Sequence, residues 1–185
     1  MSNKKKIGLL FGSFDPPHIG HLNAAVKAFE KEDLEAVWVI PAWQNPWKDN
    51  KPADIDDRAI MFNFMIGDMM DTKEGNSFPI IVKNLEGLLK PEYTYEVINY
   101  LVYEWSDFDF YIIGGQDIHE QISKWKNAQF ILDNCKFIEI DRNEINISST
   151  VIRERIRNNK PLTPFLTKHV IKFLEVNPNL YKAND

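Results

Sequence analysis

The stretch over residues 7–23, IGLLFGSFDPPHIGHLN, constrains the fold more than any other part of this chain. It opens with an apolar run, Ile7 to Phe11, of the length expected for a buried strand. Pro16 and Pro17 have no backbone N–H to donate, so the strand cannot continue through them. A helical pattern follows from His21 to about Lys31. The stretch therefore predicts a strand, a tight loop and a helix N-terminus, where unpaired N–H groups and a positive dipole favour an anion.

Two histidines, His18 and His21, lie three residues apart at the expected helix start. If the helix begins near His18, both imidazoles lie on one face. Two imidazoles beside backbone N–H groups suit a polyphosphate whose charge increases during a reaction. The alternative is an ordinary strand–turn–helix connection with two surface histidines. The length of the Gly-Ser-Phe-Asp-Pro-Pro-His-x-Gly-His string favours the functional interpretation.

The length and the net charge of the chain limit the classes of protein to which it can belong. A chain of 185 residues predicts one domain over 1–185, with a helical C-terminal part from about residue 148. A formal net charge of −5 argues against a general nucleic-acid binder, although local cations can still bind a small anion. The single cysteine, Cys135, excludes an intrachain disulfide. We see no signal peptide or membrane-spanning stretch after Lys4–Lys6, and we expect a cytoplasmic protein.

Strand and helix patterns alternate along the rest of the chain. Strands are predicted at 36–41, 78–82, 109–115 and 136–140. Helices are predicted at 54–71 and 94–104 with Asp54 and Thr94 as N-caps, from 117 to about 134, and at 163–176 with Pro164 as its first residue. This order predicts an α/β, Rossmann-like, doubly wound fold with a mainly parallel sheet of about five strands and helices on both faces. Ligands of such sheets bind at the carboxyl ends of the strands.

A second polar cluster, Ser148-Ser149-Thr150, precedes an apolar pattern and predicts another helix start with exposed hydroxyl and N–H groups. Arg153 falls in the first turn of that helix, where a cation opposes the helix dipole. A bound phosphate would reconcile the two, because N–H groups and a guanidinium can share one anion. The alternative, an arginine on an exposed helix surface, accounts well for Arg155 and Arg157.

The two motifs, H-x-G-H and I-S-S-T-x-I-R, resemble the signature of the nucleotidyltransferase superfamily. The Phe-Asp-Pro-Pro-His form is most similar to nicotinate- and nicotinamide-mononucleotide adenylyltransferases. Further elements resemble that family in the family's order, namely Pro41–Lys48, Tyr93-Thr94, and Ile113–Asp117 with Trp125. The chain departs from the pattern at Trp47, where the family usually has histidine, and in the short segment from 140 to 147.

The resemblance implies transfer of AMP from ATP to a pyridine mononucleotide, with nicotinate mononucleotide favoured over nicotinamide mononucleotide, releasing pyrophosphate and forming an NAD-type dinucleotide. It implies that His18, His21 and Arg153 are catalytic. The implied ATP site comprises these three residues with Gly12, Ser13, Phe14, Gly20, Gly114, Asp117, Ser149 and Thr150. The implied pyridine-mononucleotide site comprises Lys48, Thr94 and Trp125. Mg²⁺ is expected to bridge the triphosphate, with no protein ligand of its own.

Other interpretations remain at this point. Another adenylyl- or cytidylyltransferase of the superfamily, such as a phosphopantetheine adenylyltransferase, would not need the Trp43–Lys48 loop, Thr94 and Trp125. A non-catalytic nucleotide-sensing module would not need a histidine pair together with Arg153. Individually, Trp125 could be a core residue, Lys48 a solvated lysine and Asp117 an N-cap. The sequence leaves open the choice between nicotinate and nicotinamide. It also leaves open whether the chain forms a homo-oligomer.

Overall fold

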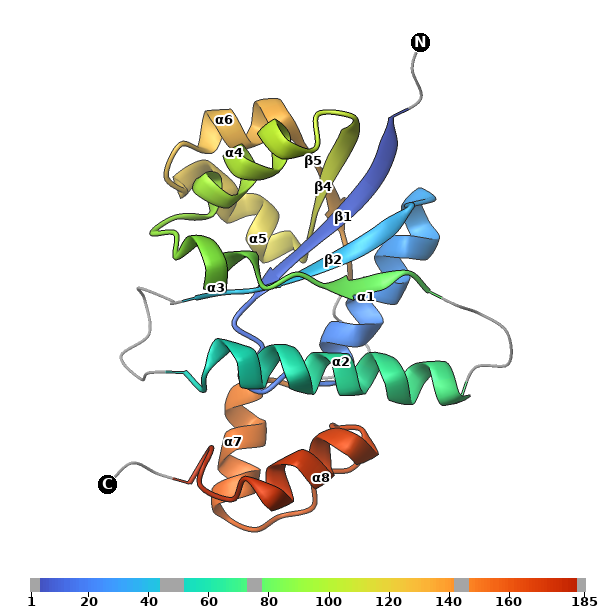
Figure 1. Cartoon of the computed structure of the whole chain (residues 1–185), viewed down its shortest axis with the longest axis vertical. Helices are drawn as coiled ribbons and strands as arrows, with labels where there is room; N and C mark the ends of the chain where they lie inside the picture. The colour runs from blue at the N-terminus through green and yellow to red at the C-terminus, as the bar shows by residue number, and fades with distance from the viewer. Residues whose placement is uncertain (1–3, 44–51, 73–77, 142–146, 183–185) are drawn as a thin grey trace.

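The five strands found in the described part of the chain form one parallel sheet in a computed structural model, which describes residues 4–43, 52–72, 78–141 and 147–182 (Figure 1). The strand order is β3-β2-β1-β4-β5, and each neighbouring pair is parallel. The strands are β1 (Lys5–Gly12), β2 (Ala36–Pro41), β3 (Ile80–Val82), β4 (Phe108–Gly114) and β5 (Cys135–Glu139). The predicted α/β, doubly wound fold is confirmed, and its order reverses between β1 and β4, where such folds bind ligands.

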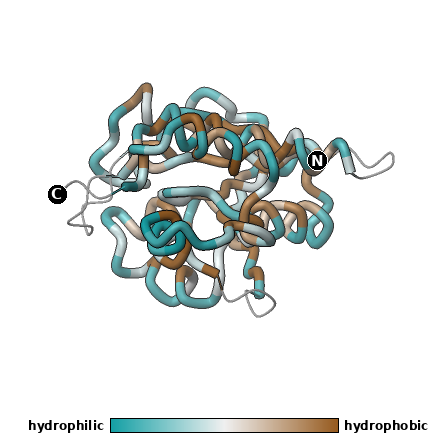
Figure 2. Tube along the Cα trace, turned by 90° about the horizontal axis from the view of Figure 1, so that it is seen from below, coloured by the Kyte–Doolittle hydropathy of each residue, from teal (hydrophilic) through white to brown (hydrophobic). Residues whose placement is uncertain are grey.

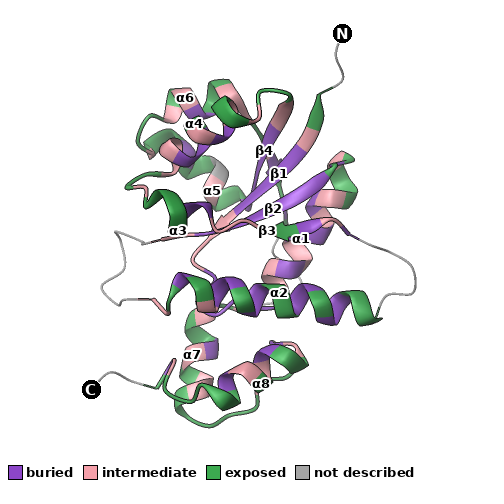
Figure 3. Ribbon diagram, in the orientation of Figure 1, coloured by how far each residue is buried: buried purple, intermediate pink, exposed green. Residues whose placement is uncertain are grey.

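Helices cover both faces of the sheet, because side chains along each strand point alternately to opposite sides. On one face, Leu10 of β1 packs in a core with α1 (Ile19–Glu32) and α2 (Ile55–Thr72). On the other, Ile7 and Leu9 pack with α3 (Leu85–Leu89) and α4 (Thr94–Glu104), and α6 (Ala128–Asn134) extends this layer. Figure 3 shows the result as buried strands between helices that are buried on one side and exposed on the other.

The remaining helices complete the two ends of the molecule. Gly114 leads into α5 (Gln116–Gln121), followed by a short 3₁₀ turn over Ile122–Lys124. Beyond the sheet lie α7 (Ser149–Arg157) and α8 (Lys168–Val176), and α2 lies between them and the strands (Figure 1). Figure 2 shows hydrophobic residues in both helices and strands, with hydrophilic ones on the outer turns. Within the described ranges, no helix is long and apolar enough to cross a membrane.

Several predicted element starts were wrong, including that of α1, which begins at Ile19 rather than at His21. Three others have a clear physical reason. Helix α8 begins at Lys168 rather than at Pro164, because the Phe165 carbonyl accepts a hydrogen bond from the Ile19 amide at 3.0 Å and ties that segment to α1. Strand β3 begins at Ile80 rather than at Phe78, because Pro79 has no N–H for a strand ladder. The N-cap of α4 is Tyr93 rather than Thr94, and the Tyr93 amide donates to the carboxylate of Glu96 at 3.3 Å.

Asp68 of α2 caps the N-terminus of α8 from a different part of the chain. Its side chain is only 7% exposed, and Oδ2 accepts the backbone N–H of His169 at 3.0 Å. The other carboxylate oxygen pairs with Nδ1 of His169. Burial alone would raise the pKa of Asp68, but its interactions with Thr167 and His169 outweigh burial, and the pKa lies below its ordinary value. The carboxylate satisfies a helix N–H that would otherwise lack a partner, so it fixes α8 against α2.

Replacing this capping carboxylate should destabilise the fold without touching the sheet. We expect Asp68→Ala to lower the free energy of unfolding by about 2 kcal/mol, because two hydrogen bonds to a buried carboxylate are lost. Urea denaturation followed by circular dichroism measures the change.

Asp71→Ala is the matched control on the same helix. Asp71 is 68% exposed and its ion pair with Lys168 spans 4.0 Å, so its loss should cost less than about 0.5 kcal/mol. Equal effects of the two substitutions would show that Asp68 is not a cap.

Candidate active site

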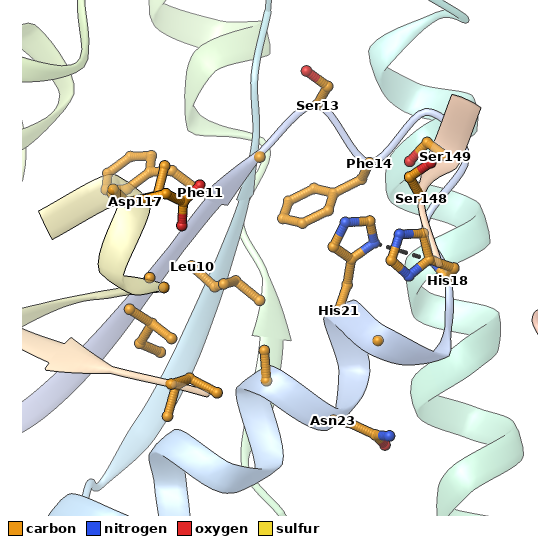
Figure 4. A pocket seen from close by; sticks show the side chains of 18 of the residues that line it. Leu10, Phe11, Ser13, Phe14, His18, His21, Asn23, Asp117, Ser148 and Ser149 are labelled. Atoms are coloured by element: carbon orange, nitrogen blue, oxygen red, sulfur yellow. Dashed lines mark hydrogen bonds between the residues drawn. The ribbon is translucent and has the colours of Figure 1, made fainter. Parts of the chain in front are cut away.

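A cavity of about 650 Å³ opens at the carboxyl ends of β1 and β4 (Figure 4). It lies at the point where the strand order reverses, as the sequence predicted for a ligand. Most of the predicted site residues line it: Gly12, Ser13, Phe14, His18, Gly20, His21, Gly114, Asp117, Trp125, Ser149 and Thr150. Asn23, Lys27 and Asp141 also line the cavity, and the sequence motifs gave no signal for them.

The loop after β1 makes a sharp turn at Phe14, whose φ of 48° lies in the left-handed region. The turn folds the Phe14 ring back over Gly12, where a Cβ atom would come within 2.7 Å of the ring. A side chain at Gly12 would therefore displace Phe14. The ring meets the imidazole of His21 edge-on, with centroids 4.9 Å apart. The glycine in the motif thus provides the space that lets Phe14 support His21.

The two motif histidines stack against each other at the start of α1 (Figure 4). His18 is the N-cap, and the ring centroids lie 3.6 Å apart. The backbone N–H of His18 donates to Nδ1 of His21 at 3.1 Å. A nitrogen that accepts cannot carry a proton, so the proton of neutral His21 lies on Nε2, which acts as a donor. Burial lowers the pKa of His18 to about 4, so this ring is neutral at pH 7.

The N-terminus of α7 lies beside the histidine pair. Ser148 is its N-cap and accepts the N–H of Val151 at 3.3 Å, as predicted. The Ser149 hydroxyl donates to the carbonyl of Pro16 at 2.9 Å, which ties α7 to the Asp-Pro-Pro turn. The positive ends of α1 and α7 therefore converge on one cavity. This arrangement suits an anion such as a phosphate chain.

Arg153 lies under the loop, and its side chain is not part of the cavity lining. Its guanidinium donates to the backbone carbonyl of Asp15, lies 3.6 Å from the carboxylate of Asp15, and donates to the Thr150 hydroxyl at 3.2 Å. The predicted role in phosphate binding remains a prediction. In this structure the arginine joins α7 to the turn.

The far end of the cavity holds Asp117 and Trp125. Asp117 is the second residue of α5, whose N-cap is Gly115, so the N-cap alternative for Asp117 was wrong. Trp125 is half-buried and packs partly against the core while also lining the cavity. Thr94 begins α4 but does not line the cavity. Lys48 lies outside the described residues, so its predicted role stays a prediction.

Two buried charged residues near the loop, Arg58 and Glu86, escaped the sequence analysis, and the motif residue Asp15 is buried as well. Arg58 belongs to α2 and shares the face of Ile55 and Phe62, so helical spacing could have placed it in the core. Burial raises the pKa of Glu86 to about 7, although its hydrogen bond from the Trp43 amide at 2.7 Å and the Arg58 charge act in the opposite direction. The sequence analysis missed Arg58 because a charged residue is normally expected on the exposed face of a helix.

Protonation of the buried His18 should make the fold less stable in acid. The unfolded chain binds this proton below about pH 6.5, whereas the folded chain binds it only near pH 4. The free energy of unfolding should therefore fall between these values by an amount on the order of 3 kcal/mol. Urea denaturation at several pH values measures the fall, which should be smaller in His18→Asn. Identical pH slopes in the two proteins would contradict the burial of a neutral imidazole.

The sequence matches the family described as Cytidylyltransferase-like over residues 9–155. Curated relatives from Halalkalibacterium halodurans and Bacillus cytotoxicus both carry the name "Probable nicotinate-nucleotide adenylyltransferase". The first is 34% identical over 200 residues, covering 98% of this chain and 93% of the relative. The second is 32% identical over 196 residues, covering 97% and 100%.

Among solved structures, the fold is similar to that of Plasmodium falciparum nicotinic acid mononucleotide adenylyltransferase complexed with NaAD. The TM-score is 0.74 over 96% of this chain and 97% of that chain, at 20% identity. That likeness bears on the fold, while the family rests on the sequence matches. The chain belongs to the cytidylyltransferase-like family of nucleotidyltransferase enzymes, as its H-x-G-H and I-S-S-T-x-I-R motifs predicted.

Proposed function

We propose that this enzyme transfers AMP from ATP to nicotinate mononucleotide, releasing pyrophosphate and forming the nicotinate form of the NAD-type dinucleotide. The observation that carries the proposal is the stacked pair His18 and His21 where two helix N-termini converge on the cavity. The names of the full-length relatives favour nicotinate as the pyridine. A volume of about 650 Å³ lies within the usual range of small-molecule sites.

The proposed reaction joins two anions in line. A phosphate oxygen of the mononucleotide attacks the α-phosphorus of ATP, the new P–O bond forms, and the bond to the β-phosphate bridging oxygen breaks to release pyrophosphate. The nucleophile is already ionised, so no side chain needs to remove a proton. The protein must align two anions that repel each other and stabilise the charge that grows on the transferred group.

His21 is proposed to supply that stabilisation. Its Nδ1 accepts the His18 amide, so the proton of the neutral ring lies on Nε2 and makes that nitrogen the donor. The N–H groups at the start of α1 and α7 add to it without any movement during the reaction. Because burial lowers the pKa of His18, this ring contributes no positive charge at pH 7, and the stacking fixes the geometry of the pair.

The remaining predicted residues are proposed for the two ends of the substrates. Asp117 would accept hydrogen bonds from ribose hydroxyls, and Trp125 would stack on the pyridine ring. Ser149 and Thr150, with Arg153 directly beside them, would hold the β- and γ-phosphates. We keep Thr94 and Lys48 as candidates for the mononucleotide on the family resemblance alone.

ATP is proposed to enter as its Mg²⁺ complex. Within the described ranges, no group of three or more His, Cys, Asp or Glu side chains could hold a metal ion. The phosphate oxygens of ATP would supply most of the ligands of the ion. When bound, the ion would neutralise part of the triphosphate charge. We propose that the reaction takes place in the cytoplasm. A homo-oligomer remains compatible with the sequence.

Pyrophosphate release tests the proposed reaction directly. The enzyme, with ATP and Mg²⁺, is offered nicotinate mononucleotide and nicotinamide mononucleotide in parallel. We expect kcat/KM for the nicotinate substrate to be higher by at least about tenfold, since an unpaired amide in a site built for a carboxylate costs more than 1 kcal/mol. Turnover with neither substrate would overturn the proposal, and phosphopantetheine and other phosphate acceptors would then be tested.

His21→Ala separates chemistry from stability. Loss of one oriented donor to the transition state should lower kcat by about 10²-fold or more, whereas the free energy of unfolding should fall by only about 1 kcal/mol, because the His18 amide loses its acceptor. His169→Ala is the matched control, since this histidine contacts Asp68 and does not line the cavity. This variant should lose stability without losing turnover. Parallel losses of activity and melting temperature in His21→Ala would count against a catalytic role.

A further inference from the structure

The most deeply buried charge among the described residues lies beneath the active-site loop and does not line the cavity. Arg58 of α2 is only 1% exposed. Taking a guanidinium out of water is costly unless every donor finds a partner. Burial lowers the pKa of Arg58, and the charges of Asp15, Asp54 and Glu86 oppose that shift. An arginine side chain stays protonated in proteins, so the position of this buried guanidinium is fixed by directional hydrogen bonds.

Two of those contacts join separate backbone segments. Nη1 of Arg58 donates to the carbonyl of Ser13 at 2.6 Å, and Nε donates to the carbonyl of Ala53 at 2.8 Å. The Ala53 amide in turn donates to Oδ1 of Asp15 at 3.1 Å. A guanidinium can hold both carbonyls at once because its donors diverge in one rigid plane. Lysine carries a single nitrogen on a flexible chain, so it cannot reproduce this pair of contacts in the same geometry.

The held carbonyl immediately precedes the strained residue of the loop. Phe14 follows Ser13 with a φ of 48°, and its ring lies over Gly12 and against His21. Phe14 is itself only 2% exposed and also packs edge-on against Phe62 of α2, with centroids 5.1 Å apart. Two residues of α2 therefore hold the same turn: Arg58 binds the Ser13 carbonyl, and Phe62 packs against the Phe14 ring. Movement of the Ser13 carbonyl would move the ring on which His21 rests.

We propose that Arg58 is a positioning residue, which sets the orientation of the His21 imidazole through the Ser13 carbonyl and the Phe14 ring. It touches no substrate in the proposed reaction. The kinetic consequence rests on the proposed function, whereas the effect on the His21 ring does not. The two readouts below therefore distinguish failure of this inference from failure of the proposed function.

The first readout is the ring of His21 in the full-length protein. Imidazole ¹⁵N resonances report which nitrogen carries the proton, and the chain has only four histidines to assign. In Arg58→Lys we expect the His21 resonances to shift toward a mixture of tautomers, with His169 unchanged. Arg157→Lys, an exposed arginine on α7, is the matched control and should leave all four rings at their wild-type positions. Wild-type His21 resonances in Arg58→Lys would overturn the proposal.

The second readout is a split between kcat and KM. Arg58→Lys should lower kcat by about tenfold or more, with KM for ATP within about threefold of wild type, because a misdirected donor harms the transition state more than binding. Phe14→Leu, which removes the ring but keeps apolar bulk, should shift His21 in the same way. The double variant should then be no worse than the more severe single variant, since both act on one connection.

Folding of the variants is checked by circular dichroism before either readout. If Arg58→Lys does not fold, Arg58→Gln takes its place, because its amide can donate to the Ser13 carbonyl alone. If neither folds at 25 °C, Arg58 is a structural residue and the proposal is overturned. Additive losses in the double variant would equally overturn it, since the arginine and the ring would then act on His21 independently.

Discussion

The structure depends on how the chain accommodates one buried carboxylate, that of Asp15. An ionised group out of water must be surrounded by donors and opposite charges, and here those come from distant segments. The amide of Ala53 and the guanidinium of Arg153 contact it directly, and Tyr181, whose pKa burial and the Asp15 charge raise, is buried nearby. The partners that the Asp15 carboxylate needs therefore bring α2, α7 and the end of the described chain together around the turn after β1.

The same arrangement explains how an acidic protein can present a site for anions. The net charge is −5, yet the cavity is lined by the positive ends of two helices and by imidazole donors. Backbone dipoles need no counterion and do not titrate, and the low pKa of His18 keeps that ring from adding a variable charge. Recognition then relies on donors held in place, and we propose that the buried Arg58 helps to hold them from behind the cavity wall.

What the sequence predicted correctly was encoded locally. The strand, the loop and the helix start around His18 and His21 follow from neighbouring residues, and so do the five strands and the serine cap of α7. The starts of β3 and α4 depend on neighbouring residues, Pro79 and Glu96, but the start of α8 and the surroundings of the two arginines depend on partners far away in the chain. The start of α8 is set by Asp68 and Ile19, the neighbour of Arg153 is Asp15, and Arg58 reaches Ser13. No pattern within a helix reveals which distant carbonyl a buried cation will meet.

The contacts around Asp15 also govern when the site can form. Arg153 and Asp15 are 138 positions apart, so their contact forms only after most of the intervening chain has folded. Long-range closure of this kind slows folding, whereas β1 and α1 can associate early. The strand–loop–helix segment would therefore exist before its support does. During refolding, the appearance of activity should coincide with the last slow phase, which makes turnover a measure of complete folding rather than of sheet formation.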